Sequence, residues 1–313
     1  MNEVSTGAAA SSAQERVKEL EKKLTGVGYL PDDRTTLAAF LALELDKPLL
    51  VEGPAGVGKT DLARALAEAL GRDLIRLQCY EGLDESKALY EWDYAKQILY
   101  TQLLRDAVSK KLSTANSIAE AADQVGDADA AFFSEKFLLA RPLLKALTSE
   151  SPVVLLIDEV DRADPEFEAF LLEILADRQV TIPELGTMKA KHAPLIVLTT
   201  NGTRDMTDAL RRRCLHVFVD YPPPSREIAI LEKRVPGLSK ELAAQLAKIA
   251  ERLRKLDLRK APSISESIDW ARALVLLGAN ALDKEVMRAT LGVLVKYDED
   301  RERVENKLDS LLT

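Results

Sequence analysis

The sequence predicts an α/β protein in which a parallel five-stranded sheet is followed by an all-helical region. Of five expected strands, the apolar runs at 48–51, 152–157 and 195–200 lack the alternation of a half-exposed strand, as is typical of strands buried on both faces of a parallel sheet. Stretches with helical periodicity separate them, which favours an αβα sandwich. The run YPPPS at 221–225 ends this pattern, because three prolines continue neither a strand ladder nor a helix interior. The expected strands are residues 48–51, 74–78, 152–157, 195–200 and 215–219.

Three regions follow from this pattern. Residues 1–14 are small and polar, and we expect a disordered tail there. Residues 15–220 form the expected αβα core, with a helical insert at about 101–150. Residues 221–313 read as helices to the end, and we expect them to form a lid on the core.

The most informative motif is GPAGVGKT at residues 53–60, between the first expected strand and a helical pattern. In that position glycines let backbone N–H groups point at phosphate oxygens, and the helix N-terminus favours negative charge. Lys59 would reach the β- and γ-phosphates, and Thr60 would offer a hydroxyl to Mg²⁺. The alternative is a glycine-rich turn with a solvated lysine. The expected nucleotide-binding residues are Gly53, Pro54, Ala55, Gly56, Val57, Gly58, Lys59, Thr60 and Asp61.

Two carboxylates, Asp158 and Glu159, directly follow the third expected strand. The carboxyl ends of parallel strands are where α/β sheets place their ligands. We expect Asp158 to hold the Mg²⁺ shell and Glu159 to orient and deprotonate the attacking water. The alternative is an acidic pair that stabilises a helix N-terminus.

Asn201 follows the fourth expected strand, and an arginine cluster precedes the fifth. An amide at a strand end can hydrogen-bond both a γ-phosphate and the lytic water, although an Asn before Gly is often only a turn residue. Arg211, Arg212 and Arg213 have no evident partner within their own helix. One of them supplied to a neighbouring subunit's nucleotide would explain the cluster, whereas the alternative is a solvated basic face.

Composition limits the other classes of function. A formal charge of −8 argues against a dedicated nucleic-acid binder, which would need a basic stripe. The two cysteines, Cys79 and Cys214, imply no disulfide framework, and with only two histidines no His/Cys metal cluster is expected. No signal core or run of about 20 apolar residues is present. We therefore expect a cytoplasmic protein whose only metal is Mg²⁺ delivered with ATP.

In this order, the loop, acids, asparagine and arginines resemble the AAA+ ATPases. The stretch DEVDRADPEFEAFLLEILADRQVTIPELG (158–186) followed by LIVLTTN (195–201) is similar to the MoxR group of that family. Within the group, QCYEGLDESKALYEWDYAKQILYTQLLRD (78–106) and SISESIDWARAL (263–274) are similar to the CoxD subgroup. CoxD ATPases are associated with maturing the copper–molybdenum site of carbon monoxide dehydrogenase.

The resemblance implies roles, partners and a location. It assigns nucleotide phosphates to the loop, Mg²⁺ to Thr60 and Asp158, the catalytic base to Glu159, and sensor 1 to Asn201. Arg213 is the first candidate for an arginine finger acting in trans, and Arg212 is the second. The implied assembly is a homo-oligomeric ring, expected to be a hexamer, with a von Willebrand factor A-domain adaptor and a client metalloenzyme. Through such a partner the protein would reach the inner face of the membrane.

One departure from the family pattern leaves alternatives open. The lid helix of many AAA+ proteins begins with a sensor 2 arginine, but residues 263–267 here read SISES. Arg272, further along that helix, is a substitute or a solvent-facing residue. The competing functions are a nucleic-acid-stimulated AAA+ motor and a nucleotide-dependent scaffold with little hydrolysis.

Two further segments have both a structural and a functional interpretation. Residues 90–100 are rich in aromatics, and Tyr90, Tyr94 and Ile98 would share one helix face, so that core packing is the default and a pore or partner contact the alternative. Residues 180–193, VTIPELGTMKAKHA, are expected to form a hairpin whose basic residues contact a client or only cap a solvated turn.

Overall fold

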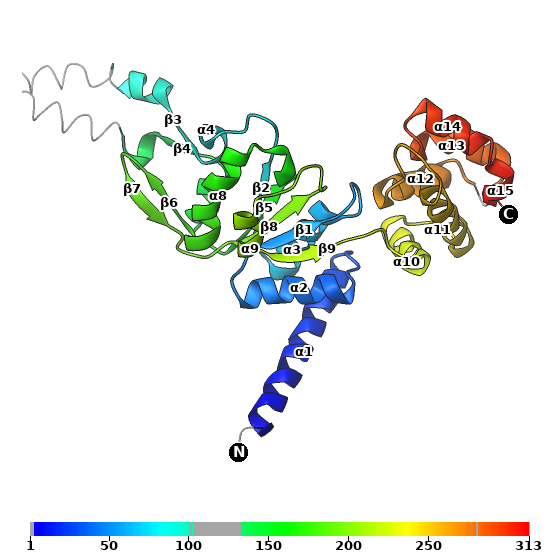
Figure 1. Ribbon diagram of the computed structural model, residues 1–313, viewed down its shortest axis with the longest axis horizontal. Helices are drawn as coiled ribbons and strands as arrows, with labels where there is room; N and C mark the ends of the chain where they lie inside the picture. Colours follow the sequence, from blue (N-terminus) through cyan, green and yellow to red (C-terminus); the bar gives the residue numbers. More distant parts are fainter. Residues whose placement is uncertain (1–2, 101, 103–132, 280, 313) are drawn as a thin grey trace, which may run out of the picture.

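The computed structural model describes residues 3–100, 102, 133–279 and 281–312. At its centre is a parallel five-stranded sheet with the strand order β2-β5-β8-β1-β9 (Figure 1). The predicted α/β class is confirmed, and each expected strand is present with its bounds shifted by at most two residues. The strands are β1 (Leu49–Glu52), β2 (Asp73–Gln78), β5 (Val153–Asp158), β8 (Leu195–Thr200) and β9 (Leu215–Phe218).

Helices cover both faces of the sheet, as the unbroken apolar runs require. In β5 the alternation divides Val154 and Leu156, which pack on one face, from Leu155 and Ile157, which pack on the other. The first face carries α1 (Glu3–Gly26), α2 (Asp33–Glu44) and α3 (Lys59–Leu70). The second face carries α4 (Glu85–Ala88), α7 (Pro142–Leu147), α8 (Pro165–Asp177) and α9 (Asp208–Arg213).

The N-terminal segment differs from the expectation. Residues 3–14, for which we expected a disordered tail, form the first turns of α1. Consecutive alanines at 8–10 favour helix, because alanine has the highest helix propensity. The second part of α1 packs against α2 and α3, and its Leu20 and Leu24 are buried.

The segment after β2 also differs. The predicted helix over residues 90–98 is wrong at its start, because β3 (Tyr90–Trp92) pairs antiparallel with β4 (Leu138–Ala140). Helix begins only at Tyr94, and Tyr94 and Ile98 are 61% and 59% exposed, so core packing is wrong for both. Of the expected insert at 101–150, residues 101 and 103–132 lie outside the described residues. The rest contains η1 (Glu135–Phe137), β4 and α7 rather than helix alone.

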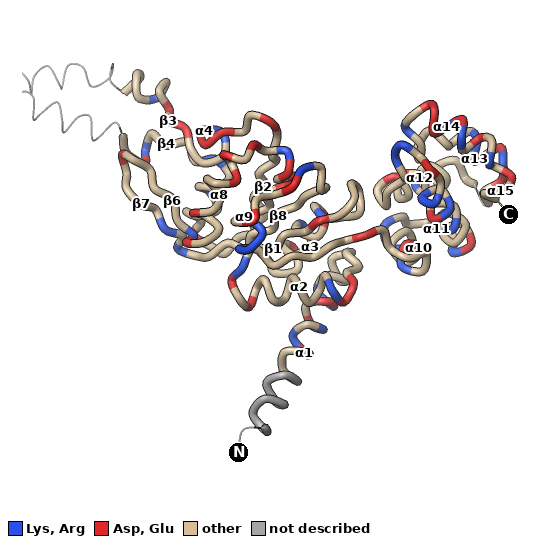
Figure 2. The backbone as a smooth tube through the Cα atoms, in the orientation of Figure 1, with Lys and Arg blue, Asp and Glu red and all other residues tan. Residues whose placement is uncertain are grey.

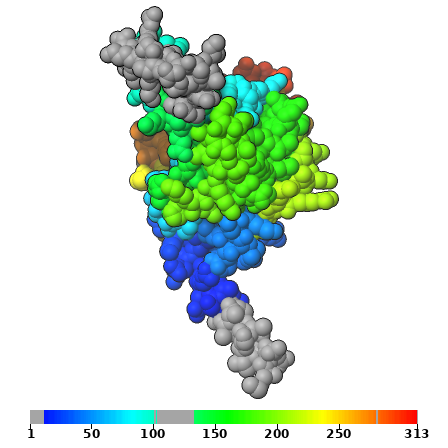
Figure 3. Space-filling model, turned by 90° about the vertical axis from the view of Figure 1, so that its left-hand side faces the viewer, coloured from blue at the N-terminus to red at the C-terminus, as the bar shows by residue number. Residues whose placement is uncertain are grey.

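The expected hairpin is confirmed. After β5 a short turn of 3₁₀-helix, η2 (Val160–Arg162), leads into α8, and β6 (Gln179–Ile182) then pairs antiparallel with β7 (Gly186–Lys189). Figure 1 shows this hairpin beside α8, at the end of the molecule opposite the C-terminal helices. Figure 3 views the molecule from this side, where the green segments form much of the surface.

The C-terminal region is a separate helical layer with its own core (Figure 1). Trp270 is fully buried there, and its Nε1 donates a hydrogen bond to Thr290 Oγ1 at 2.8 Å. In the described part of the chain, no helix has the length and apolar character needed to span a bilayer. We use the name lid for this region, whose helices are α10 (Pro224–Arg234), α11 (Lys240–Arg254), α12 (Ile264–Leu276), α13 (Lys284–Leu294), α14 (Asp298–Glu305) and α15 (Leu308–Leu312).

Candidate active site

The glycine-rich loop joins β1 to the N-terminus of α3 and lies against two other parts of the chain. Gly53 has a φ of 156°, and a Cβ there would stand 2.0 Å from the Val219 carbonyl oxygen. A Cβ on Gly56 would stand 2.2 Å from Ser263 Oγ in the lid. The sequence therefore needs glycine here both for the turn and for close backbone approach.

Lys59, the first residue of α3, is buried beneath this loop. Its Nζ donates to the carbonyl oxygens of Gly53 and Pro54 at 2.8 and 2.7 Å, and to Asn201 Oδ1 at 2.8 Å. Burial lowers the pKa of Lys59, although the neighbouring carboxylates of Asp161, Asp158 and Glu159 oppose the shift. The ammonium group is thus held by neutral oxygens that a phosphate can replace.

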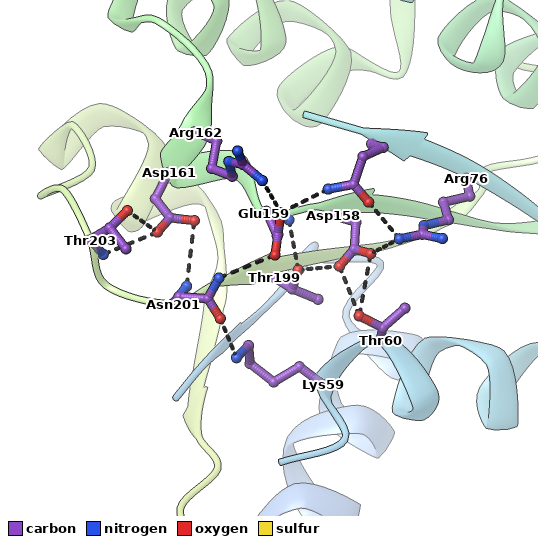
Figure 4. Close-up of polar contacts among 11 residues, drawn as sticks. Lys59, Thr60, Arg76, Asp158, Glu159, Asp161, Arg162, Thr199, Asn201 and Thr203 are labelled. Carbon is purple, nitrogen blue, oxygen red and sulfur yellow. Dashed lines mark hydrogen bonds and ion pairs between the residues drawn. The ribbon is translucent and has the colours of Figure 1, made fainter. Parts of the chain in front are cut away.

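Asp158 ends β5 and is 2% exposed. Its Oδ1 accepts hydrogen bonds from Thr60 Oγ1 at 2.9 Å and from Thr199 Oγ1 at 2.6 Å. Its Oδ2 accepts from Arg76 Nη2 at 2.6 Å (Figure 4). Strand pairing explains the convergence, since β5 lies between β2 and β8 and its carboxyl end meets α3.

These residues fit a magnesium ion that arrives with a nucleotide. The Thr60 hydroxyl and the Asp158 carboxylate are hard oxygen donors, in contact with each other at the wall of a cavity of about 230 Å³. Across the described ranges, no group of three or more His, Cys, Asp or Glu side chains is arranged to hold a metal. The other ligands of such an ion would be phosphate oxygens and water, as is usual for Mg²⁺.

Glu159 occupies a strained position immediately after the strand. Its φ of 54° and ψ of 52° lie in the left-handed region, which non-glycine residues rarely adopt and which recurs at functional sites. The carboxylate accepts from Gln78 Nε2 at 3.0 Å, Arg162 Nη1 at 3.1 Å and Asn201 Nδ2 at 3.4 Å. Its backbone N–H donates to Thr199 Oγ1 at 2.9 Å, so a hydroxyl from β8 helps to hold the turn.

Asn201 connects the lysine to the glutamate. Its Oδ1 accepts from Lys59 and its Nδ2 faces Glu159. This orientation of the amide is required because an ammonium group only donates hydrogen bonds and a carboxylate only accepts them. Asp161 fixes the loop that follows β8 by accepting from Thr203 Oγ1 at 2.6 Å and from the Thr203 N–H at 3.0 Å. Burial alone would raise the pKa of Asp161, but the hydrogen bonds from Thr203 and Asn201 outweigh it and lower that pKa.

Two adjoining cavities flank the loop. The loop cavity, of about 230 Å³, is lined by Lys59, Thr60, Asp158, Glu159, Thr199 and Asn201, among others. The lid cavity, of about 180 Å³, lies between the core and the C-terminal helices and includes Gly28, Tyr29 and Leu30. Gly56, Gly58, Asp61 and Ser265 line both. Of the expected nucleotide-binding residues, Ala55, Gly56, Val57, Gly58, Lys59, Thr60 and Asp61 line one cavity or both.

One face of α10 covers the lid cavity. Arg226, Ile230 and Arg234 are spaced by four residues and all line it. Arg226 Nη1 pairs with Asp32 Oδ2 at 3.0 Å, and Arg234 Nη1 with Asp61 Oδ2 at 3.3 Å. The lid therefore contacts the core through two ion pairs that flank an apolar side chain.

Helix α12 reaches the loop without a sensor 2 arginine. The Ser265 N–H donates to the Gly56 carbonyl oxygen at 3.3 Å. Arg272 is exposed and pairs with Asp269 at 3.4 Å within the same helix, and it lines neither cavity. Arg272 is thus placed as a solvent-facing residue rather than as a substitute for the missing arginine.

The three arginines of α9 form a basic stretch of the backbone (Figure 2), and all three are exposed. Arg211 Nη2 pairs with Glu52 Oε2 at 3.4 Å, and Arg213 Nη1 donates to the Ala209 carbonyl oxygen at 3.0 Å. Within the described residues, the guanidinium of Arg212 makes no hydrogen bond or ion pair. None of the three lines the cavities of its own chain, so the structure does not bring them to the site formed by Lys59 and Glu159.

Sequence reasoning missed several residues of the site. Arg76 and Gln78 on β2 and Thr199 on β8 contact the two acids, yet we assigned no role to any of them from the sequence, although Gln78 and Thr199 lie within the segments that resemble the family. Their only signal is their place near the carboxyl ends of strands that flank β5. Arg226 and Arg234 in the lid were missed because only the folded chain brings α10 over the cavity.

The fold and site define a nucleoside-triphosphate-binding protein with a glycine-rich phosphate loop and two acids at the end of the neighbouring strand. A family model described as the AAA domain of the dynein-related subfamily matches residues 48–214, which is more than half of the chain. The chain therefore belongs to this family.

Individual relatives share only about a quarter of their residues with this chain. An uncharacterized protein of Staphylococcus epidermidis is 26% identical over 283 residues, covering 88% of this chain and 94% of the relative. One from Staphylococcus saprophyticus is 26% identical over 289 residues, covering 90% and 96%. Among solved structures, a mutant of RuvB from Thermotoga maritima has a TM-score of 0.49 and 17% identity, covering 91% of this chain and 72% of that one.

Proposed function

We propose that this protein is an ATP-hydrolysing AAA+ machine of the MoxR type that assembles as a ring and remodels a client protein complex. The observation that carries the proposal is the meeting of five side chains at one cavity. Lys59 and Thr60 from α3, Asp158 and Glu159 from the end of β5, and Asn201 from the end of β8 contact one another there. Together they provide a cation, two metal-ligand oxygens, a base and a neutral amide.

Each side chain has a role in hydrolysis. Lys59 would exchange the Gly53 and Pro54 carbonyl oxygens for the β- and γ-phosphate oxygens. Thr60 and Asp158 would hold Mg²⁺, which neutralises charge that develops on the phosphates. Glu159 would accept a proton from the attacking water, and Asn201 would orient that water against the γ-phosphate. Asn201 already contacts both the lysine and the base, so it needs no large movement.

A neighbouring subunit would complete the site. The arginines of α9 are exposed and lie outside their own chain's cavities, which supports a role in trans. The resemblance makes Arg213 the first candidate and Arg212 the second, and Arg211 is already paired with Glu52. A ring, for which six subunits is the expected number, would then make hydrolysis depend on assembly.

The client is proposed from the resemblance to MoxR ATPases. The hairpin β6–β7 between α8 and β8 agrees with the VTIP hairpin expected of that group. We propose a von Willebrand factor A-domain adaptor as partner and a molybdenum-containing dehydrogenase, such as carbon monoxide dehydrogenase, as client during cofactor maturation. The proposed location is the cytoplasm, with docking at the inner face of the membrane through the partner. Genes for such a dehydrogenase beside this one would support the client, and an unrelated operon would contradict it.

A scaffold that binds nucleotide but hydrolyses little is the second candidate. It is favoured by the position of Arg272, which pairs with Asp269 and leaves α12 without an arginine at the γ-phosphate.

Phosphate release from ATP separates these functions. The wild type should hydrolyse ATP, and Lys59→Ala should lose both nucleotide binding and hydrolysis. Nucleotide binding without hydrolysis at any protein concentration would favour the scaffold. A rate that rises only when DNA or RNA is added would point to a nucleic-acid motor and contradict the remodelling function.

A further inference from the structure

Arg64, on α3, lines the loop cavity but has no part in the mechanism above. Its side chain is exposed. Within the described residues, its guanidinium makes no hydrogen bond or ion pair. The wall of the cavity that we assign to the phosphates therefore includes a cation whose N–H groups have no acceptor.

The other charged groups in that wall already have partners. Lys59 donates to the three oxygens described above. Each carboxylate that lines the cavity pairs with an arginine that does not line it: Asp61 with Arg234, Asp158 with Arg76, and Glu159 with Arg162. Among the residues that the structure describes, Arg64 is thus the charged side chain of this wall that can meet an incoming anion without breaking a contact.

The place of Arg64 on α3 brings it to the side of the helix that faces the cavity. Arg64 follows Thr60 by four residues, so the two side chains share one face of α3. Long side chains in a helix lean toward its N-terminus, which carries the guanidinium back over the turn that contains Thr60. This agrees with the presence of both residues in the wall of the loop cavity.

Arg64 belongs to the part of the site that is farther from the lid. A nucleoside in the lid cavity would extend its phosphates across the residues shared by the two cavities, so its terminal phosphate would lie among residues that line the loop cavity alone. Arg64 is one of these, as are Glu159 and Asn201. Its position therefore suits contact with the last phosphate rather than with the nucleoside.

We propose that Arg64 contacts the terminal phosphate of ATP bound to its own subunit and makes the site prefer a triphosphate to a diphosphate. A guanidinium can donate two parallel hydrogen bonds to the oxygens of a terminal phosphate. ADP ends one phosphate earlier and leaves Arg64 without this partner. Arg64 would supply from α3 the positive charge that the start of α12, which reads SISES at 263–267, lacks.

This inference rests on the proposed function, because it needs the phosphates of ATP in the loop cavity. Three variants test it. Arg64→Met removes the charge, and Arg64→Lys keeps the charge but loses the paired donors. Arg34→Met is the matched control, because Arg34 is an exposed arginine on α2 that lines neither cavity.

Nucleotide affinity tests the inference without relying on turnover. Isothermal titration calorimetry measures the Kd of AMP-PNP and the Kd of ADP for the full chain, each with Mg²⁺. Arg64→Met should bind AMP-PNP about tenfold more weakly than wild type, because a charge-assisted contact is lost, and ADP within about twofold. Arg64→Lys should bind AMP-PNP about threefold more weakly. Arg34→Met should match wild type for both nucleotides.

Two results would overturn the inference and leave the proposed function in place. Wild-type affinity of Arg64→Met for AMP-PNP would mean that the guanidinium does not reach the terminal phosphate. An equal loss for AMP-PNP and ADP, in a variant that circular dichroism shows to be folded, would mean that Arg64 does not distinguish the triphosphate. If Arg64→Met does not fold, the same two outcomes are read from Arg64→Lys. A wild type that binds neither nucleotide would contradict the proposed function itself, and the inference with it.

Discussion

The two cavities of the site are built in different ways. The loop cavity is formed by the phosphate loop, α3 and the ends of adjacent strands, where buried side chains hydrogen-bond one another across the parallel register. The lid cavity is formed by the 28–30 segment, the β9–α10 connection and two lid helices, joined by partly exposed ion pairs. The loop cavity is therefore suited to chemistry that needs fixed geometry. The lid cavity is suited to sensing whether the lid is closed on a nucleotide.

The largest expected effect lies in the loop cavity. Glu159→Gln keeps the shape of the side chain but removes the base, so kcat should fall about 10³-fold while nucleotide affinity is retained. Phosphate release and equilibrium binding of a fluorescent ATP analogue measure the two quantities. Glu166→Gln, an exposed acid at the start of α8 that does not line the loop cavity, is the control and should hydrolyse normally. Normal turnover by Glu159→Gln would mean that the loop cavity does not supply the catalytic base.

The next effect concerns the stability of the lid that closes the other cavity. Arg254 and Glu227 form a bidentate pair at 2.6 and 2.9 Å, with side-chain exposures of 10% and 0%, that ties α11 to α10. Glu227→Ala leaves a buried guanidinium without its partner and should destabilise the lid by about 3 kcal/mol. Urea denaturation measures this loss.

The exposed pair of Glu251, on α11, and Lys255, the residue that follows α11, is the matched control for that experiment. Glu251→Ala should cost about 0.5 kcal/mol or less, because exposed ion pairs contribute little. Equal losses for Glu227→Ala and Glu251→Ala would mean that the buried pair does not hold α10 in place.

A smaller effect, on nucleotide affinity, is expected when one ion pair between the lid and the core is removed. Arg234→Ala removes the pair with Asp61 at the junction of the cavities, and nucleotide affinity should fall about threefold with kcat at saturation unchanged. Arg272→Ala, which lines neither cavity, should have wild-type affinity. A larger loss for Arg272→Ala than for Arg234→Ala would return the sensor 2 role to Arg272.

The smallest effect concerns the two thiols, which lie at opposite ends of the sheet. Cys79 follows β2 and Cys214 precedes β9, and burial raises the pKa of each to about 12. At pH 8 nearly all of each thiol is protonated, so reaction with a disulfide reagent should be slow in the native protein and fast after unfolding. Rapid native labelling of Cys79 would show that the carboxyl end of β2 opens to solvent.

The difference between the loop cavity and the lid cavity explains which site residues the sequence could predict. Lys59, Thr60, Asp158, Glu159 and Asn201 were identified because a loop or strand end that binds phosphate is encoded by contiguous residues. Their geometry confirms that they meet at one cavity, while their catalytic roles stay predictions.

Residues whose function depends on tertiary pairing were not predictable in this way. Arg76 and Gln78 become visible only once β2 is paired with β5 in register. The local periodicity of residues 90–98 predicts helix, but pairing with β4 makes Tyr90–Trp92 a strand. This pairing could not be predicted locally, because β4 lies far along the chain. For the lid cavity, the sequence anticipates the loop residues Gly56, Val57, Gly58 and Asp61, whereas the residues of α10 and α12 contribute only through the packing of two regions.

In the proposed ring, hydrolysis uses a base from one subunit and an arginine from the next. The most direct measurement is the ATPase rate of Glu159→Gln, of Arg213→Ala and of their mixture, each against protein concentration, with Arg212→Ala run in parallel. The account predicts two nearly inactive variants whose mixture regains activity that grows with concentration, because some interfaces then pair an intact base with an intact arginine. Normal hydrolysis by both arginine variants, or a mixture as inactive as its components, would contradict the shared site.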